Sequence, residues 1–125
     1  MIAWVAGHSH VNVVQPYPGP NGTGFWSIRT AAEADWPQQN RLIQIMNNQD
    51  GTLSIFGTIL DHAGQATAPP SGTYAWGLTD TDLASIGRTL SYNDPQVGAE
   101  KCTPKCGEGT PADRNVELLI DDPRN

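Results

Sequence analysis

The chain has 125 residues and a formal net charge of −6, with 7 lysines and arginines against 13 aspartates and glutamates. Its length suits one small domain with a modest core. An acidic chain with no block of basic residues is a poor candidate for binding nucleic acid or an anionic membrane surface, so we interpret the acidity as a contribution to solubility.

Charged residues make up only 16% of the chain, which contains 13 glycines and 10 prolines. This composition favours strands, turns and ordered loops over long surface helices. No apolar run approaches the roughly 18 residues of a membrane-spanning helix, so we expect no membrane partner. The stretch MIAWVAGHSH lacks the basic and apolar segments of a signal peptide, so we do not expect it to direct export, and the cellular location stays open.

The first part of the chain alternates between short apolar runs and turn residues. Residues 2–7, IAWVAG, are apolar and end at a glycine, which predicts an inner strand covered on both faces. Residues 12–24 contain three prolines and an Asn-Gly pair, which predicts a loop. Residues 24–32 predict a second strand, after which the chain turns at Pro37.

Residues 41–62 carry the pattern of a β-hairpin. Apolar and β-branched residues at 41–47 and 52–62 flank an Asp-Gly pair, the usual residues of a tight hairpin turn. Residues 63–77 are rich in proline, glycine and alanine and predict an irregular segment.

One helix is expected, at about residues 80–92, followed by a loop over 95–113 and a short strand over about 114–120. Thr79 or Asp80 can cap the helix, and Asp82 also suits the first turn of a helix. Three apolar residues fall near helical spacing on one face, which predicts that this face is buried: Leu83, Ile86 and Leu90.

Together the elements predict a β-rich α/β fold in a single domain spanning 1–125. Core strands and the hairpin occupy 1–62, and a loop-rich C-terminal extension occupies 63–125. Cys102 and Cys106 lie in that extension with three residues between them. They could close a small disulfide loop or stay as free thiols, and we favour both over zinc because no second pair of ligands follows.

Two of the three histidines stand in Gly7-His8-Ser9-His10, directly after the first predicted strand. Ligands of open α/β sheets gather at the carboxyl ends of strands, and neutral imidazole is a common ligand of first-row metals. Histidines two residues apart point the same way in an extended segment, or reach two neighbouring ions from a turn. A histidine pair in a loop is also often only solvated or hydrogen-bonded, so His8 and His10 are candidate ligands.

The stretch WVAGHSH resembles the last signature of the calcineurin-like metallophosphoesterases, a G-H-x-H motif at the end of a core strand. Three longer blocks resemble the C-terminal region of a bacterial, chiefly actinobacterial, branch of that superfamily: GFWSIRTAAEADWPQQNRLIQI, GTLSIFGTILDH and GTPADRNVELL. The resemblance covers most of the chain, and DWPQQNRL is its more branch-specific part. It implies that the chain forms part of a two-sheet sandwich whose core strand ends in GHSH.

In that family two divalent ions clamp a phosphate ester, and a metal-bound hydroxide attacks in line. The resemblance implies that His8 ligates the second ion and His10 the first, with Gly7 letting the backbone turn tightly beneath the site. Manganese, iron and zinc all accept histidine and carboxylate ligands. Phosphomonoesters, phosphodiesters and nucleotides all suit the family as substrates.

The chain departs from the family pattern because it lacks the earlier signatures D-x-H, G-D-x-x-D and G-N-H-[DE], which precede G-H-x-H. We therefore expect a C-terminal part of a phosphoesterase with an incomplete metal site, inactive in isolation. The strand at 2–7 would then lack a neighbour, and we expect self-association through its exposed edge. Two alternatives stay open: a non-catalytic β-rich binding or structural module, and a subunit that complements a separately encoded N-terminal half.

Two further residues, His62 and Arg29, are candidates for the site. His62 could support the metal ligands or contact substrate, but we favour a strand-end turn in which Asp61 bonds to nearby backbone. Arg29 could contact a phosphate oxygen, but an exposed ion pair with Glu33 is the expected state.

Overall fold

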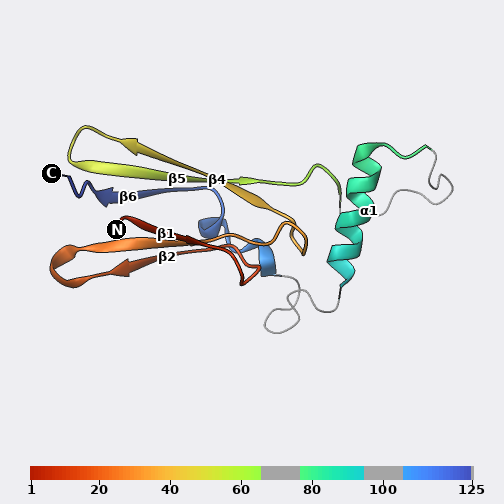
Figure 1. Cartoon of the computed structure of the whole chain (residues 1–125), viewed down its shortest axis with the longest axis horizontal. Coiled ribbons are helices and arrows are strands. Elements are labelled where there is room, and N and C mark those ends of the chain that lie inside the picture. The colour runs from red at the N-terminus through yellow and green to blue at the C-terminus, as the bar shows by residue number, and fades with distance from the viewer. Residues whose placement is uncertain (66–76, 95–105, 125) are drawn as a thin grey trace.

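Two three-stranded sheets pack face to face in the computed structural model, which describes residues 1–65, 77–94 and 106–124 (Figure 1). The first sheet has the order β1-β3-β2 and the second the order β4-β5-β6. The strands are β1 (Ala3–Ala6), β2 (Val13–Pro18), β3 (Gly24–Arg29), β4 (Asn40–Asn47), β5 (Thr52–Leu60) and β6 (Val116–Asp121). The helical elements are α1 (Asp80–Asn93) and the short 3₁₀ turns η1 (Pro20–Gly22), η2 (Cys106–Glu108) and η3 (Pro111–Asp113). The predicted β-rich class is confirmed for these residues.

The core lies between the two sheets. Its buried centre is Ile28 from β3, Ile55 from β5 and Leu118 from β6. Partly buried apolar side chains from both sheets surround this centre: Ile2, Ala3, Val14, Trp26, Ile43, Val116 and Ile120. Each fully buried aliphatic side chain stabilises the fold by about 1.5–3 kcal/mol. Because the cluster contains residues of both sheets, this burial holds the two layers together.

β1 lies at an edge of the first sheet, so the prediction of an inner strand covered on both faces is wrong. It pairs in parallel with β3 and has no second strand neighbour among the described residues. Trp4 and Val5 point to opposite faces because successive side chains alternate along a strand. Their side chains are 60% and 53% exposed, so both faces of this strand are accessible to solvent rather than buried.

β2 corrects the prediction of a loop over 12–24. The N–H of Val14 points away from β3 and donates to the Asp113 carboxylate at 2.8 Å. Pro16 and Pro18 follow at two-residue intervals, so their nitrogens face the same outer edge, where no bond to β3 is lost. Two prolines are therefore compatible with this edge strand.

The hairpin predicted over 41–62 is confirmed. β4 and β5 pair antiparallel from Asn40 opposite Leu60 to Asn47 opposite Leu53. In the turn Gly51 has φ of 96°, a conformation that favours glycine, and the Asp50 carboxylate accepts from the N–H of Thr52 at 2.9 Å. β6 then pairs antiparallel with β5, so the predicted C-terminal strand is an integral part of the second sheet.

The helix α1 begins as predicted, with a capping box between Thr79 and Asp82. Its buried face is not the predicted one. Leu83 and Leu90 are 55% and 68% exposed, whereas Ser85, Arg88 and Ser91 are buried. The reason is that Arg88 makes several polar contacts with the turn after β5, and these contacts leave the apolar stripe facing outward.

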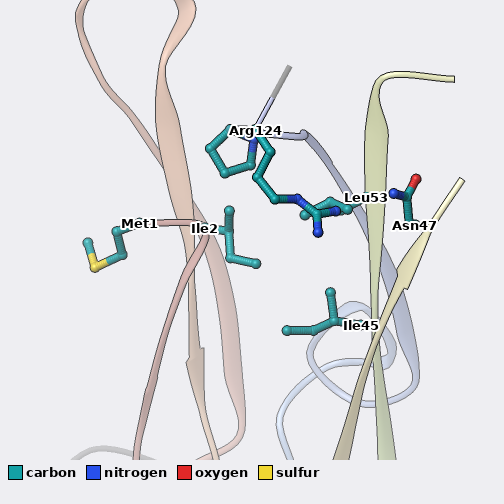
Figure 2. Close-up of a pocket in the computed structure, with 7 residues that line it drawn as sticks. Met1, Ile2, Ile45, Asn47, Leu53 and Arg124 are labelled. Carbon is teal, nitrogen blue, oxygen red and sulfur yellow. The ribbon is translucent and has the colours of Figure 1, made fainter. Parts of the chain in front are cut away.

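The sandwich is open on the side where β1 and β4 lie. A pocket of about 530 Å³ separates Met1 and Ile2 from Ile45, Asn47 and Leu53, as Figure 2 shows. Ile45 shares the inward face of β4 with Ile43, yet it is largely exposed. The exposed side chains of Met1, which lies just before β1, and of Ile45 on β4 therefore lie at the same side of the molecule.

Some predictions fall on residues outside the described ranges. They are most of the irregular segment at 63–77, the part of the 95–113 loop before residue 106, and Cys102 of the cysteine pair. No helix in the described ranges has the length and apolar character needed to cross a bilayer.

Candidate functional site

The segment Gly7-His8-Ser9-His10 follows β1 at the carboxyl end of the parallel pair β1 and β3. Ala6 lies opposite Arg29 in the ladder, and the N–H of Thr30 donates to the carbonyl of Ala6 at 3.0 Å. Both histidines are exposed. Figure 1 shows β1 and β5 running toward the same end of the two sheets, the end near α1.

The backbone of this segment is strained at the histidines themselves. His8 and His10 have φ of 75° and 52°, values that side chains with a Cβ rarely adopt. The N–H of Ser9 donates to the carbonyl of Gly7 at 3.0 Å, which closes a γ-turn centred on His8 of the rare form with positive φ. Strain of this kind costs about 1–3 kcal/mol per residue and often marks a functional segment.

Gly7 lies directly before the tight turn. It is not among the residues of positive φ, and a Cβ placed on it would meet nothing within 4 Å. The tight turn of this segment is centred on His8.

His10 is paired with a residue that the sequence analysis missed. Its Nδ1 lies 2.6 Å from the Oδ2 of Asp35, and both side chains are partly exposed, at 47% and 35%. Asp35 lies in the segment DWPQQNRL, and the resemblance of that segment to a phosphoesterase branch was the one signal in the sequence that could have marked it. His8 and His10 are neighbours in the sequence, whereas the carboxylate that contacts His10 comes from the connection between β3 and β4.

A buried amide holds this neighbourhood together. Asn12 donates through Nδ2 to the Gln39 side chain at 2.8 Å and to the carbonyl of Glu108 at 3.4 Å. Its Oδ1 accepts from the N–H of Ala31 at 3.0 Å and from Arg41 at 3.5 Å. The backbone two residues after His10 is therefore fixed to the segment after β3, to β4 and to η2.

Arg29 ends β3 beside this segment. Ile28 points into the core, so Arg29 points to the opposite face of the sheet. Among the described residues Arg29 makes no ion pair, and the expected pair with Glu33 is not formed.

His62 lies in a strand-end turn, as favoured from the sequence. Its N–H donates to the Asp61 carboxylate at 2.8 Å, and its Nδ1 accepts from the N–H of Gly64 at 3.0 Å. These bonds account for its position without a metal or substrate.

Arg88 of α1 docks onto this same turn. It donates to the carbonyls of His62 and Gly64 at 3.1 Å each and to the Asp61 carboxylate at 3.1 Å. Its guanidinium also lies over the Trp36 ring, 5.2 Å from the centroid. Asp61 and Arg88 thus explain how a polar face of α1 is buried.

The described residues do not complete a metal centre. Among them, no three histidine, cysteine, aspartate or glutamate side chains are grouped closely enough to hold an ion. His8 and His10 supply two imidazoles, and Asp35 is engaged by one of them. A dinuclear centre needs further carboxylates to neutralise and space its ions, so these residues can contribute ligands but cannot form the centre alone.

No protein family, curated protein or solved structure matches this chain in comparisons with known proteins. The geometry of the site therefore carries the functional argument.

We expect His8→Gly to stabilise the folded protein by about 1 kcal/mol, because glycine adopts positive φ without a Cβ clash. Urea unfolding followed by circular dichroism measures the change. His62→Gly is the matched control and should be destabilising, since it removes the acceptor of the Gly64 N–H. A loss of stability in His8→Gly would contradict the strained turn.

Acid should weaken the docking of α1 through Asp61. Burial opposes ionisation of this carboxyl, but the His62 N–H and the charges of Arg88 and Arg114 outweigh burial and lower the pKa of Asp61. The unfolded state then binds the proton first, so the stabilisation is complete above the ordinary aspartate pKa of about 4 and is lost as pH falls through the folded value.

The free energy of unfolding of the wild type should therefore decrease on acidification below about pH 4. Asp61→Asn should be less stable at neutral pH and should show a shallower decrease. Denaturant titrations across this pH range measure both slopes, and equal slopes would contradict the role given to Asp61.

Proposed function

We propose that this chain forms the C-terminal part of a metal-dependent phosphoesterase domain and that His8 and His10 are two ligands of its dinuclear centre. The observation that carries the proposal is the position of the pair. Two exposed imidazoles, both on strained backbone, follow β1 at the carboxyl end of a parallel strand pair. That is where ligands of α/β sheets gather, and functional segments often retain such strain.

The two imidazoles would hold and space two divalent ions, which when bound would polarise a phosphate ester and activate water. Arg29 ends the neighbouring strand and has no ion pair among the described residues, so its guanidinium is available for a phosphate oxygen. The substrate class that follows is a phosphate ester. His62 has no part in this proposal because its contacts are those of a turn.

The open edge of β1 supports the view that further chain completes the domain. β1 is short, at four residues, but it carries neither the charge nor the proline that also protect edge strands, and it exposes Trp4 and Val5 on its two faces. We propose that another strand pairs with β1 and supplies the remaining ligands. The same edge suits the alternative in which a separately encoded half provides that strand.

The isolated chain should bind Zn²⁺ weakly and hydrolyse phosphate esters at no more than the background rate. His8→Ala and His10→Ala should each weaken Zn²⁺ binding at least about tenfold, because each removes one of two ligands. His62→Ala is the matched control and should bind as the wild type does. Isothermal titration calorimetry and a p-nitrophenyl phosphate assay make these measurements.

Either of two results would overturn this proposal. One is Zn²⁺ binding that neither His8→Ala nor His10→Ala alters. The other is metal-dependent hydrolysis by the purified chain that His8→Ala abolishes, which would show a complete enzyme rather than a part.

The exposed edge should also make the isolated chain self-associate, by pairing of β1 between copies. Sedimentation should show association that rises with concentration. Val5→Lys should weaken it at least about tenfold, because pairing would bury an unpaired charge. Leu90→Lys, on the exposed stripe of α1, is the control. If only Leu90→Lys weakened self-association, the contact between copies would lie on the helix rather than on β1.

A further inference from the structure

We infer that Asp35 is a positioning residue for His10: it holds the neutral imidazole as the Nδ1–H tautomer and leaves Nε2 as the atom that faces a ligand. The use of Nε2 for a metal rests on the proposed function. The tautomer and the orientation rest on the geometry alone.

The contact between His10 and Asp35 decides which nitrogen carries the proton. Nδ1 lies 2.6 Å from the Asp35 Oδ2, and an ionised carboxylate only accepts hydrogen bonds, so Nδ1 is the donor. A neutral imidazole has one donor and one acceptor nitrogen, which leaves the lone pair on Nε2. Histidines that bind metals are commonly fixed in this way by a carboxylate on the other nitrogen.

Asp35 is itself held in place by its own segment. The N–H of Gln38 donates to the Asp35 carbonyl at 2.7 Å, and the Gln38 side chain donates to the Ala34 carbonyl at 3.2 Å. The N–H of Gln39 donates to the Ala32 carbonyl at 3.1 Å, which closes the base of the turn. The carboxylate therefore stands on an ordered turn rather than on a free loop.

The turn that carries Asp35 is also fixed relative to the backbone of His10. Asn12 joins the two segments through the Gln39 side chain. Gly107 packs between them so closely that a Cβ would lie 2.9 Å from the Trp36 carbonyl oxygen and 3.1 Å from that of His10. The imidazole and the carboxylate are thus held to each other by a buried amide and by close backbone packing.

His8 provides an internal contrast. Its side chain makes no hydrogen bond or ion pair within the described residues, so nothing there selects its tautomer. The two histidines of the motif therefore differ: His10 is preset and His8 is free to adjust.

Long-range ¹H–¹⁵N NMR spectra of the metal-free, ¹⁵N-labelled chain test this inference directly. At about pH 9, where imidazoles are neutral, His10 should be the Nδ1–H tautomer. Asp35→Ala should convert it mainly to the Nε2–H form that a free histidine side chain prefers. Asp35→Asn should retain Nδ1–H because the amide oxygen still accepts, and Glu33→Gln, a matched carboxylate in the same segment, should change nothing.

Zn²⁺ titration of the same variants separates this inference from the proposed function. Asp35→Ala should lose about 10–100-fold in affinity, Asp35→Asn less, and Glu33→Gln none. An Asp35-dependent tautomer in a chain that binds no Zn²⁺ would support the positioning role while the proposed function fails. Zn²⁺ binding through His10 with the Nε2–H tautomer in the wild type, or a tautomer unaltered by Asp35→Ala, would overturn the positioning role.

Discussion

The arrangement of the segments that connect the strands depends on the side chain of Asn12. Its fully buried amide bonds to Ala31 after β3, to Gln39 before β4, to Arg41 on β4 and to Glu108 in η2. A buried amide without these partners would cost several kcal/mol, so the three partner segments must close around it in one register.

Arg41 extends this network to the second sheet. It donates to the carbonyls of Arg114 and Asp113 at 2.8 and 2.5 Å, just before β6 begins. Burial lowers the pKa of Arg41, and the charge of Asp113 opposes that effect. The site end of the sandwich is thus organised by polar groups, whereas the apolar core that joins the sheets is small.

The sequence predicted correctly those features that depend on residues close together in the chain. The Asp-Gly turn and alternating β4 and β5 gave the hairpin, and the Thr79 cap gave the start of α1, because each depends on neighbours in the chain. β2 was missed because the cost of a proline depends on which way its nitrogen faces in the sheet. The prediction of the buried face of α1 was wrong because Arg88 finds partners in the turn after β5, and the spacing of the apolar residues in α1 does not reveal those partners.

The candidate site followed the same division. His8 and His10 could be identified because a strand, a glycine and two imidazoles are adjacent in sequence. Asp35 could not be assigned a role, since its contact with His10 arises only when the connection between β3 and β4 folds back onto the end of β1. The sequence pattern likewise did not predict the positive φ values of the two histidines, because the neighbouring glycine was the residue expected to make the turn.

The docking of α1 has a consequence for how the molecule opens. The helix is attached by the contacts of Arg88 and by the packing of Arg88 and Tyr92 against the Trp36 ring. No residue of α1 belongs to the apolar cluster around Ile28, Ile55 and Leu118. Its detachment would break charged and aromatic contacts without opening the space between the sheets. We therefore expect α1 to behave as a separate cooperative unit, whose amides exchange with solvent through a partial opening that leaves β4, β5 and β6 paired.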